Sequence, residues 1–121
     1  MTAARRKGSR FERDVATYLA EHGFPGAERR VMGGSKDRGD IAGVTGWALE
    51  CKATRDVDLA GATTEAKAEA RNAGVVDYAA ILKRRNHPVA GAYVVLPLDR
   101  FVHLLNRERR VTTIVAAGDS A

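Results

Sequence analysis

The hydrophobic positions switch between a helical and a strand period along the chain, and they predict an α/β fold. Helices are expected over residues 9–22, 58–73 and from 97 to about 105. Strands are expected over residues 26–32, 40–43, 47–52, 78–85 and 91–96, with a final edge strand over 111–117. The main order, helix, three strands, helix, two strands, helix, suits a central mixed sheet with helices on both faces.

Capping residues mark the ends of two predicted helices. Ser9 followed by Glu12 has the spacing of a capping box, and Gly23 is a typical helix stop. Asp58 is the expected N-cap of the second helix, and Gly74 its stop. We expect one domain over residues 1–121, with residues 1–8 and 118–121 flexible.

Residues 39–52 are predicted to form a β-hairpin. A three-residue loop at 44–46 would place Gly46 in the left-handed conformation and set Asp40 opposite Glu50. A two-residue loop would slip the pairing by one residue and mix the two faces, so the first register is preferred. Its apolar face carries Trp47, Leu49 and Cys51.

The other face of this hairpin would present Asp40, Glu50 and Lys52 together. Two carboxylates opposite each other repel, and a hard divalent cation relieves that repulsion by taking both as oxygen ligands. The lysine would then orient or deprotonate a water molecule, or bind a phosphate. The alternative is a solvated sheet face with a cross-strand pair of Lys52 and Asp40.

The charge distribution favours a polyanionic partner. Twenty Lys and Arg residues against fifteen Asp and Glu give a net charge of +5. Nine of the bases precede the candidate acids: Arg5, Arg6, Lys7, Arg10, Arg13, Arg29, Arg30, Lys36 and Arg38. This placement indicates nucleic acid, the alternative being a merely soluble basic protein. The glycine-rich loop at 33–39 either places Lys36 or Arg38 on a phosphate or is an ordinary connector.

Other chemistry finds little support in the sequence. Cys51 is the only cysteine, so neither an internal disulfide nor a thiolate zinc site is expected. The phosphate-binding pattern GxxxxGK[ST] is missing, and no nucleotide cofactor is expected. No apolar run is long enough for a bilayer, and no apolar segment follows the basic start. We therefore expect a cytoplasmic protein of a bacterial, archaeal or phage-infected cell, without membrane contact.

Several short motifs occur in an order that resembles a known family. They are Arg6-Lys7-Gly8-x-x-x-Glu12-Arg13, then Leu19 to His22-Gly23-Phe24, then Arg29 or Arg30 with Gly34-Ser35, then Asp40-Ile41 and Glu50-x-Lys52. Together they resemble the opening of archaeal-type Holliday junction resolvases, which belong to the PD-(D/E)xK nuclease superfamily. The resemblance covers residues 5 to about 54, and the later elements agree only in order. One departure is Gly39, which stands where the family motif has proline.

The resemblance implies a restriction-endonuclease-like core and a homodimer that hydrolyses phosphodiesters symmetrically in four-way DNA junctions. Asp40, Glu50 and the backbone carbonyl of Cys51 would hold Mg²⁺, for which Mn²⁺ is expected to substitute. Lys52 would position or activate water, and Glu12 would be a further acid unless it serves only as the helix cap. DNA contacts would come from Arg5, Arg6, Lys7, Arg10, Arg29 or Arg30, Ser35, Lys36 and Arg38.

Two other functions fit the same residues. One is a restriction-like or repair nuclease of this superfamily that acts on linear or flap DNA. The other is a non-catalytic DNA-binding module on a similar fold. The presence of Asp40, Glu50 and Lys52 together favours an enzyme.

Overall fold

The computed structural model describes residues 2–31 and 36–119. Over these residues the elements are α1 (Ala3–Glu21), β1 (Glu28–Arg29), β2 (Ile41–Ala42), β3 (Trp47–Lys52), α2 (Leu59–Ala73), β4 (Asp77–Leu82), the 3₁₀ turn η1 (Val89–Gly91), β5 (Tyr93–Val95) and α3 (Leu98–Asp119). The α/β class and the predicted order of helices and strands are confirmed in outline. Residues 32–35, which include the Gly34-Ser35 motif, and residues 1 and 120–121 lie outside the described residues. Residues 118–119, predicted to be flexible, are instead helical, as the last residues of α3.

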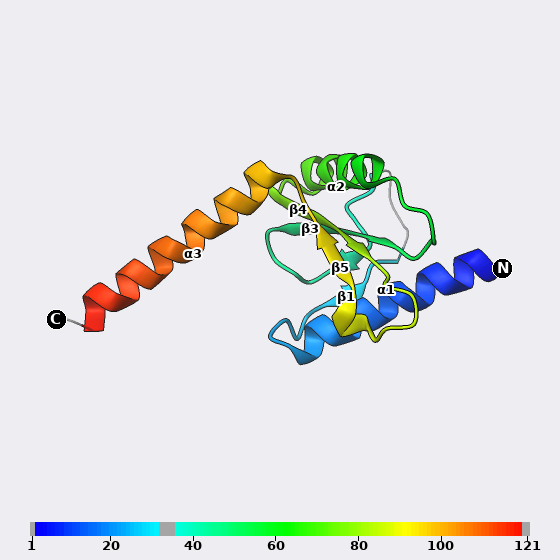
Figure 1. The fold of residues 1–121 in the computed structure, drawn as a ribbon, viewed down its shortest axis with the longest axis horizontal. Coiled ribbons are helices and arrows are strands. Elements are labelled where there is room, and N and C mark those ends of the chain that lie inside the picture. Colours follow the sequence, from blue (N-terminus) through cyan, green and yellow to red (C-terminus); the bar gives the residue numbers. More distant parts are fainter. Residues whose placement is uncertain (1, 32–35, 120–121) are drawn as a thin grey trace.

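The core is a mixed sheet between two helices (Figure 1). Strand β4 lies in the middle of the order β3-β4-β5, parallel to β3 and antiparallel to β5, and all of its residues are buried. Helix α1 packs Phe11 and Val15 against Leu49 and Ile81 on one face. Helix α2 covers the other face, where the small side chains of Ala66 and Ala70 pack on β3 and β4.

Both faces of β3 are therefore covered, which corrects the expected open polar face. Leu49 belongs to the cluster under α1, while Ala48 belongs to the cluster under α2. Because side chains alternate along a strand, Glu50 shares the α2 face with Ala48 and is only 7% exposed. A carboxylate predicted at a solvated surface is instead enclosed between a strand and a helix.

The predicted hairpin ladder between residues 40–43 and 47–52 is wrong. Strand β2 pairs with β1, with Arg29 opposite Ile41, and β3 pairs with β4. One backbone hydrogen bond, from the Asp40 N–H to the Leu49 carbonyl, joins the two segments at the site. The loop itself agrees with the prediction, since Gly46 has a φ of 86° and the Trp47 N–H closes the turn onto Val44.

The capping box assigned to Ser9 and Glu12 is also wrong, because α1 begins six residues earlier, at Ala3. Thr2 is the N-cap, and its hydroxyl accepts a hydrogen bond from the Arg5 N–H at 3.2 Å. Residues 3–8, predicted flexible, are helical. Helix formation is cooperative, so an existing helix extends through residues of fair propensity until a better cap is reached.

The ends of α2 are confirmed. The Asp58 side chain accepts a hydrogen bond from the Gly61 N–H at 3.0 Å, and Gly74 is left-handed, with a φ of 69°. Its N–H contacts the carbonyls of the last turn, as expected of a glycine helix stop.

Helix α3 extends away from the rest of the molecule (Figure 1). Arg100 and Arg107 anchor its first half through ion pairs of 3.3 and 3.0 Å to the buried Asp77. The edge strand predicted at 111–117 is wrong, because α3 continues to Asp119. β-branched residues favour a strand only when a sheet edge pairs with them, whereas a helix satisfies its own backbone. Within residues 2–31 and 36–119, no helix is both long and apolar enough to span a membrane.

Candidate metal centre

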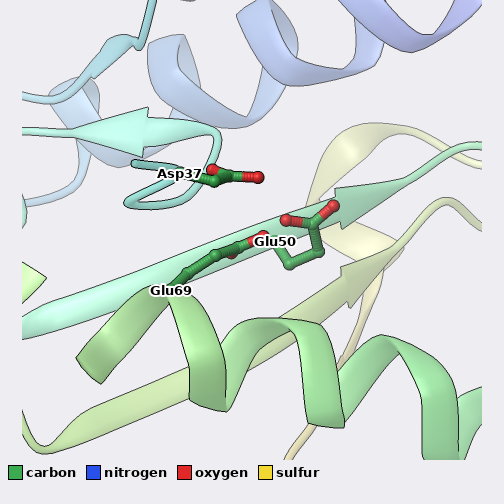
Figure 2. Close-up of side chains that lie close together, drawn as sticks. All are labelled: Asp37, Glu50 and Glu69. Carbon is green, nitrogen blue, oxygen red and sulfur yellow. The ribbon is translucent and has the colours of Figure 1, made fainter. Parts of the chain in front are cut away.

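Three carboxylates meet between β3 and α2. They are Glu50 on β3, Glu69 on α2 and Asp37 in the loop before β2, and one oxygen of each lies within 4.8 Å of the others. Figure 2 shows the three groups turned toward one another. The Oε2 atoms of Glu50 and Glu69 are buried and accept no hydrogen bond. Because buried polar atoms are nearly always satisfied, two such oxygens in one cluster need either a cation or a shared proton to compensate them.

The sequence interpretation missed Asp37 and Glu69. A signal for Glu69 was present, since it lies three residues after Ala66 and seven after Ala62, on the buried alanine stripe of α2. A carboxylate on such a stripe faces the sheet. Asp37 has no periodic signal, because its loop is placed by a hydrogen bond from the Asn72 side chain to its carbonyl.

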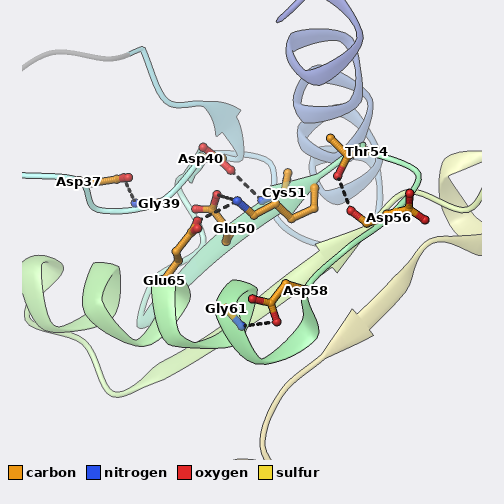
Figure 3. Close-up of polar contacts among 11 residues, drawn as sticks. Asp37, Gly39, Asp40, Glu50, Cys51, Thr54, Asp56, Asp58, Gly61 and Glu65 are labelled. Atoms are coloured by element: carbon orange, nitrogen blue, oxygen red, sulfur yellow. Dashed lines mark hydrogen bonds and ion pairs between the residues drawn. The ribbon is translucent and has the colours of Figure 1, made fainter. Parts of the chain in front are cut away.

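Asp40 lies next to this cluster and is attached to the edge of β3. Its Oδ2 accepts a hydrogen bond from the Cys51 N–H at 2.7 Å, in the position that a neighbouring strand's carbonyl would take (Figure 3). Carbonyl groups alternate along a strand, so the Cys51 carbonyl lies on the same edge as that of Leu49, toward Asp40. The structure thus brings the predicted ligands Asp40, Glu50 and the Cys51 carbonyl into one neighbourhood.

The Cys51 thiol is not a nucleophile. Burial, together with the nearby carboxylates of Asp40 and Glu12, raises the pKa of this thiol far above its ordinary value. A thiol is reactive only as its thiolate, and the side chain packs against the core under α1. This agrees with the prediction that Cys51 lies on an apolar face of its strand.

The backbone at Gly39 has a conformation that a proline, the residue at this place in the resembled motif, would not fit. Its φ is 101°, which proline cannot adopt, and its N–H donates a hydrogen bond to the Asp37 carboxylate at 3.0 Å. A β-carbon at Gly39 would lie 3.1 Å from the Leu49 carbonyl oxygen. The glycine therefore lets the loop pass close to β3 and bring Asp37 beside Glu50.

Glu12 is held inside α1 by an arginine and is not a helix cap. The Arg29 Nε donates a hydrogen bond to Glu12 at 2.7 Å, and a second guanidinium nitrogen donates to Ser9 at 3.1 Å. Glu12 also raises the pKa of Asp40 through its charge, which places it on the site side of α1. Of the two candidate arginines, Arg29 makes this contact, whereas the Nε of Arg30 is buried without a partner.

Lys52 bridges β3 and α2. Its ammonium lies 2.8 Å from Glu65 and 3.4 Å from Glu50. Burial lowers the pKa of this lysine, but the hydrogen bond to Glu65 and the charge of Glu50 outweigh it, and the net pKa is raised. Lys52 therefore stays protonated at neutral pH, in the form that donates hydrogen bonds.

The acids strongly disturb one another. Burial first, and then the charge of Glu50, raise the pKa of Asp40 from 3.8 to about 7, although the Cys51 hydrogen bond opposes the shift. Burial raises the pKa of Glu69 well above the ordinary range, and so does the hydrogen bond that Glu69 can share with Glu50 once one of the two carboxyl groups is protonated. Without a cation, protons compensate the buried charge; a bound cation would take their place.

We expect the metal-free protein to lose thermal stability as pH rises from about 4 to about 7. The folded pKa of Asp40 is raised, so in this window the folded state holds a proton that the unfolded state has released, and deprotonation costs stability. The raised pKa of Glu69 acts in the same direction. Thermal melts in EDTA across this window measure the effect, and saturating Mg²⁺ should remove most of it. A metal-free melting temperature that rises over the window would contradict the assignment.

The predicted DNA-binding residues divide into two groups. Arg5, Arg6, Lys7 and Arg10 are exposed along the first half of α1, and Lys36 and Arg38 are exposed in the loop before Asp40. Arg29 and Arg30 are half-buried instead. Ser35 lies outside the described residues.

Comparisons with known proteins do not assign the chain to a family. No protein-family model, curated protein or solved structure matches it. The resemblance to junction resolvases therefore rests on the sequence motifs alone.

Proposed function

We propose that this protein is a metal-dependent endonuclease that hydrolyses phosphodiester bonds in four-way DNA junctions. The observation that carries the proposal is the pair of buried, unpartnered carboxylate oxygens of Glu50 and Glu69, with the Lys52 ammonium 3.4 Å from Glu50. A nucleic acid fits this site because the protein has a net charge of +5 and nine of its Lys and Arg residues precede Asp40 and Glu50 in the sequence. The restriction-endonuclease-like core and the cytoplasmic location belong to the same proposal.

The donor set suits a hard divalent cation, Mg²⁺ or in its place Mn²⁺. Glu50 is common to the predicted set with Asp40 and the Cys51 carbonyl and to the cluster with Asp37 and Glu69. All of these donors are oxygens, which Mg²⁺ and Mn²⁺ prefer. When bound, the cation would supply a Lewis acid that polarises the phosphate and lowers the pKa of a water molecule.

The chain's own residues would orient the reaction. Lys52 remains protonated, so it donates a hydrogen bond to the attacking water or to a phosphate oxygen as negative charge develops there. Glu65 and Glu50 fix the ammonium from two sides, and this limits the positions that it takes. Glu12 acts on Asp40 through its charge while Arg29 compensates Glu12.

Glu69→Gln should weaken Mn²⁺ binding by about tenfold or more. Loss of a residue that only hydrogen-bonds to a metal ligand already costs about tenfold in affinity, and loss of a ligand should cost at least as much. The fold should be preserved, since the amide keeps the shape and can donate a hydrogen bond to Glu50. Isothermal titration with Mn²⁺ measures the affinity. Glu21→Gln makes the same chemical change at the exposed end of α1 and should bind Mn²⁺ normally. Equal affinity in both variants would remove Glu69 from the ligand set.

The homodimer remains part of the proposal, because symmetric cutting of two strands requires two sites. Helix α3 supports it with exposed apolar side chains. Leu98 is 75% exposed, and Phe101, Val102 and Leu105 follow it at helical spacing on the same side. A second copy of the chain would cover them.

The decisive experiment is cleavage of a labelled, immobile four-way junction with Mg²⁺, beside a duplex of equal length and an EDTA control. Symmetric nicks on opposing strands of the junction, with the duplex intact, are the expected result. Equal cutting of the duplex would favour the restriction-like or repair nuclease. Binding without cutting would favour the non-catalytic DNA-binding module.

A further inference from the structure

A basic cavity opens where the parallel strands β3 and β4 end. Its volume is about 420 Å³, and five cationic side chains line it: Lys7 from α1, Arg55 after β3, and Lys83, Arg84 and Arg85 after β4. The lining residues, all within the described part of the chain, include no acid. Of the five bases, only Lys7 belongs to the predicted DNA-binding set. Five basic side chains without a counter-charge in one cavity attract a polyanion.

This cavity adjoins the candidate metal centre. Ala53, which lines it, directly follows Lys52, and the Lys83 N–H donates a hydrogen bond to the Lys52 carbonyl at 2.9 Å. A nucleic-acid strand with a phosphate at Lys52 can therefore extend directly into the cavity.

An aromatic ring forms part of the same wall. Tyr93 on β5 lines the cavity and is 53% exposed, and the guanidinium carbon of Arg84 lies 5.5 Å from the centre of its ring. An exposed ring beside cations is the combination on which unpaired bases stack in proteins that bind single strands. The cation over the ring holds it as a platform.

We propose that this cavity binds an unpaired nucleotide of the nucleic-acid strand that passes the metal centre. Its base stacks on Tyr93, and its flanking phosphates contact Lys83, Arg85 and Arg55. The cations come from three separate segments, which suits several phosphates along a strand better than the single phosphate of a free nucleotide. The inference rests on the proposed function, because it takes this nucleic-acid strand as the substrate. The binding itself requires no metal ion.

The test uses the 121-residue chain in EDTA and measures fluorescence anisotropy with a labelled single strand of about 12 nucleotides. Tyr93→Thr removes the ring and keeps a strand-forming residue, and it should bind about tenfold more weakly. Tyr93→Phe keeps the ring and should bind normally. Lys83→Gln should weaken binding and lower the salt dependence by about one counterion. Arg110→Gln, on the exposed surface of α3, is the matched charge control and should have a smaller effect.

Each outcome decides the inference. Normal binding by Tyr93→Thr, or equal weakening by Tyr93→Phe, would overturn it. Competition by a free mononucleotide at the same concentration as the strand would show that the cavity binds free nucleotides, and would also overturn it. A protein that binds the strand through Tyr93 but never cleaves with Mg²⁺ would refute the proposed nuclease and leave the cavity standing. If the wild type cleaves with Mg²⁺ but the Tyr93→Thr variant binds the strand normally, the proposed nuclease stands and the cavity inference is refuted.

Discussion

Glu50→Gln is expected to abolish junction cleavage while junction binding is kept or strengthened. Glu50 belongs to both candidate ligand sets, so its loss should reduce the cleavage rate by about 1,000-fold or more, the equivalent of several kcal/mol of transition-state stabilisation. Binding should persist because the substitution removes a negative charge close to where phosphate lies. Single-turnover cleavage with Mg²⁺ and anisotropy in EDTA measure the two effects separately.

The same variant should be at least as thermally stable as the wild type without metal. Glu50 is buried, its Oε2 has no partner, and its charge raises the pKa values of both Asp40 and Glu69. A neutral amide ends that repulsion, so the site is stabilised as it loses its function. Parallel loss of binding and cleavage, with Glu21→Gln behaving as wild type, would show that Glu50 supports the fold and does not bind a metal.

Lys52→Met is expected to lower the cleavage rate by about 100-fold or more while Mn²⁺ affinity stays equal or increases. The substitution keeps the apolar stem of the side chain and removes the ammonium that Glu50 and Glu65 hold. Because the pKa of Lys52 is raised, the wild-type pH–rate profile should show no deprotonation of this group near neutrality. The cleavage rate and the Mn²⁺ affinity together show whether Lys52 donates a hydrogen bond in the reaction or only helps the carboxylates to bind the metal.

Lys67→Met provides the matched control, since Lys67 is an exposed lysine on α2. It should leave both cleavage and metal affinity unchanged. Lost Mn²⁺ binding in Lys52→Met would mean that the lysine organises the carboxylates. Unchanged cleavage would remove Lys52 from the reaction.

Several features followed from local sequence. Asp58 and Gly74 mark the ends of α2 because a helix cap depends on a few neighbouring residues. The left-handed Gly46 was predictable for the same reason. The motif spacing of Asp40, Glu50 and Lys52 also selected residues that lie close together in the structure, beside a helix that carries Glu12.

Other predictions failed where a local signal competed with a longer-range one. Ser9 and Glu12 have the spacing of a helix cap, but both side chains are satisfied by Arg29 from β1. Residues 111–117 have strand-forming side chains, yet a strand needs an edge with which to pair, and α3 continues through them. In the first case a distant residue, Arg29, uses the side chains that a cap would use, and in the second no sheet edge within the described residues pairs with residues 111–117.

The sequence by itself determined the α/β class, the order of the elements in outline and one carboxylate of the acidic cluster, Glu50. Only the tertiary structure decided that the site is enclosed, because α2 packs on the face of β3 that periodicity alone would leave to solvent. That packing buries Glu50 and adds Glu69, while the positive φ of Gly39 admits Asp37. Periodicity specifies which residues share a face, whereas the burial and pKa of a carboxylate depend on what is packed against that face.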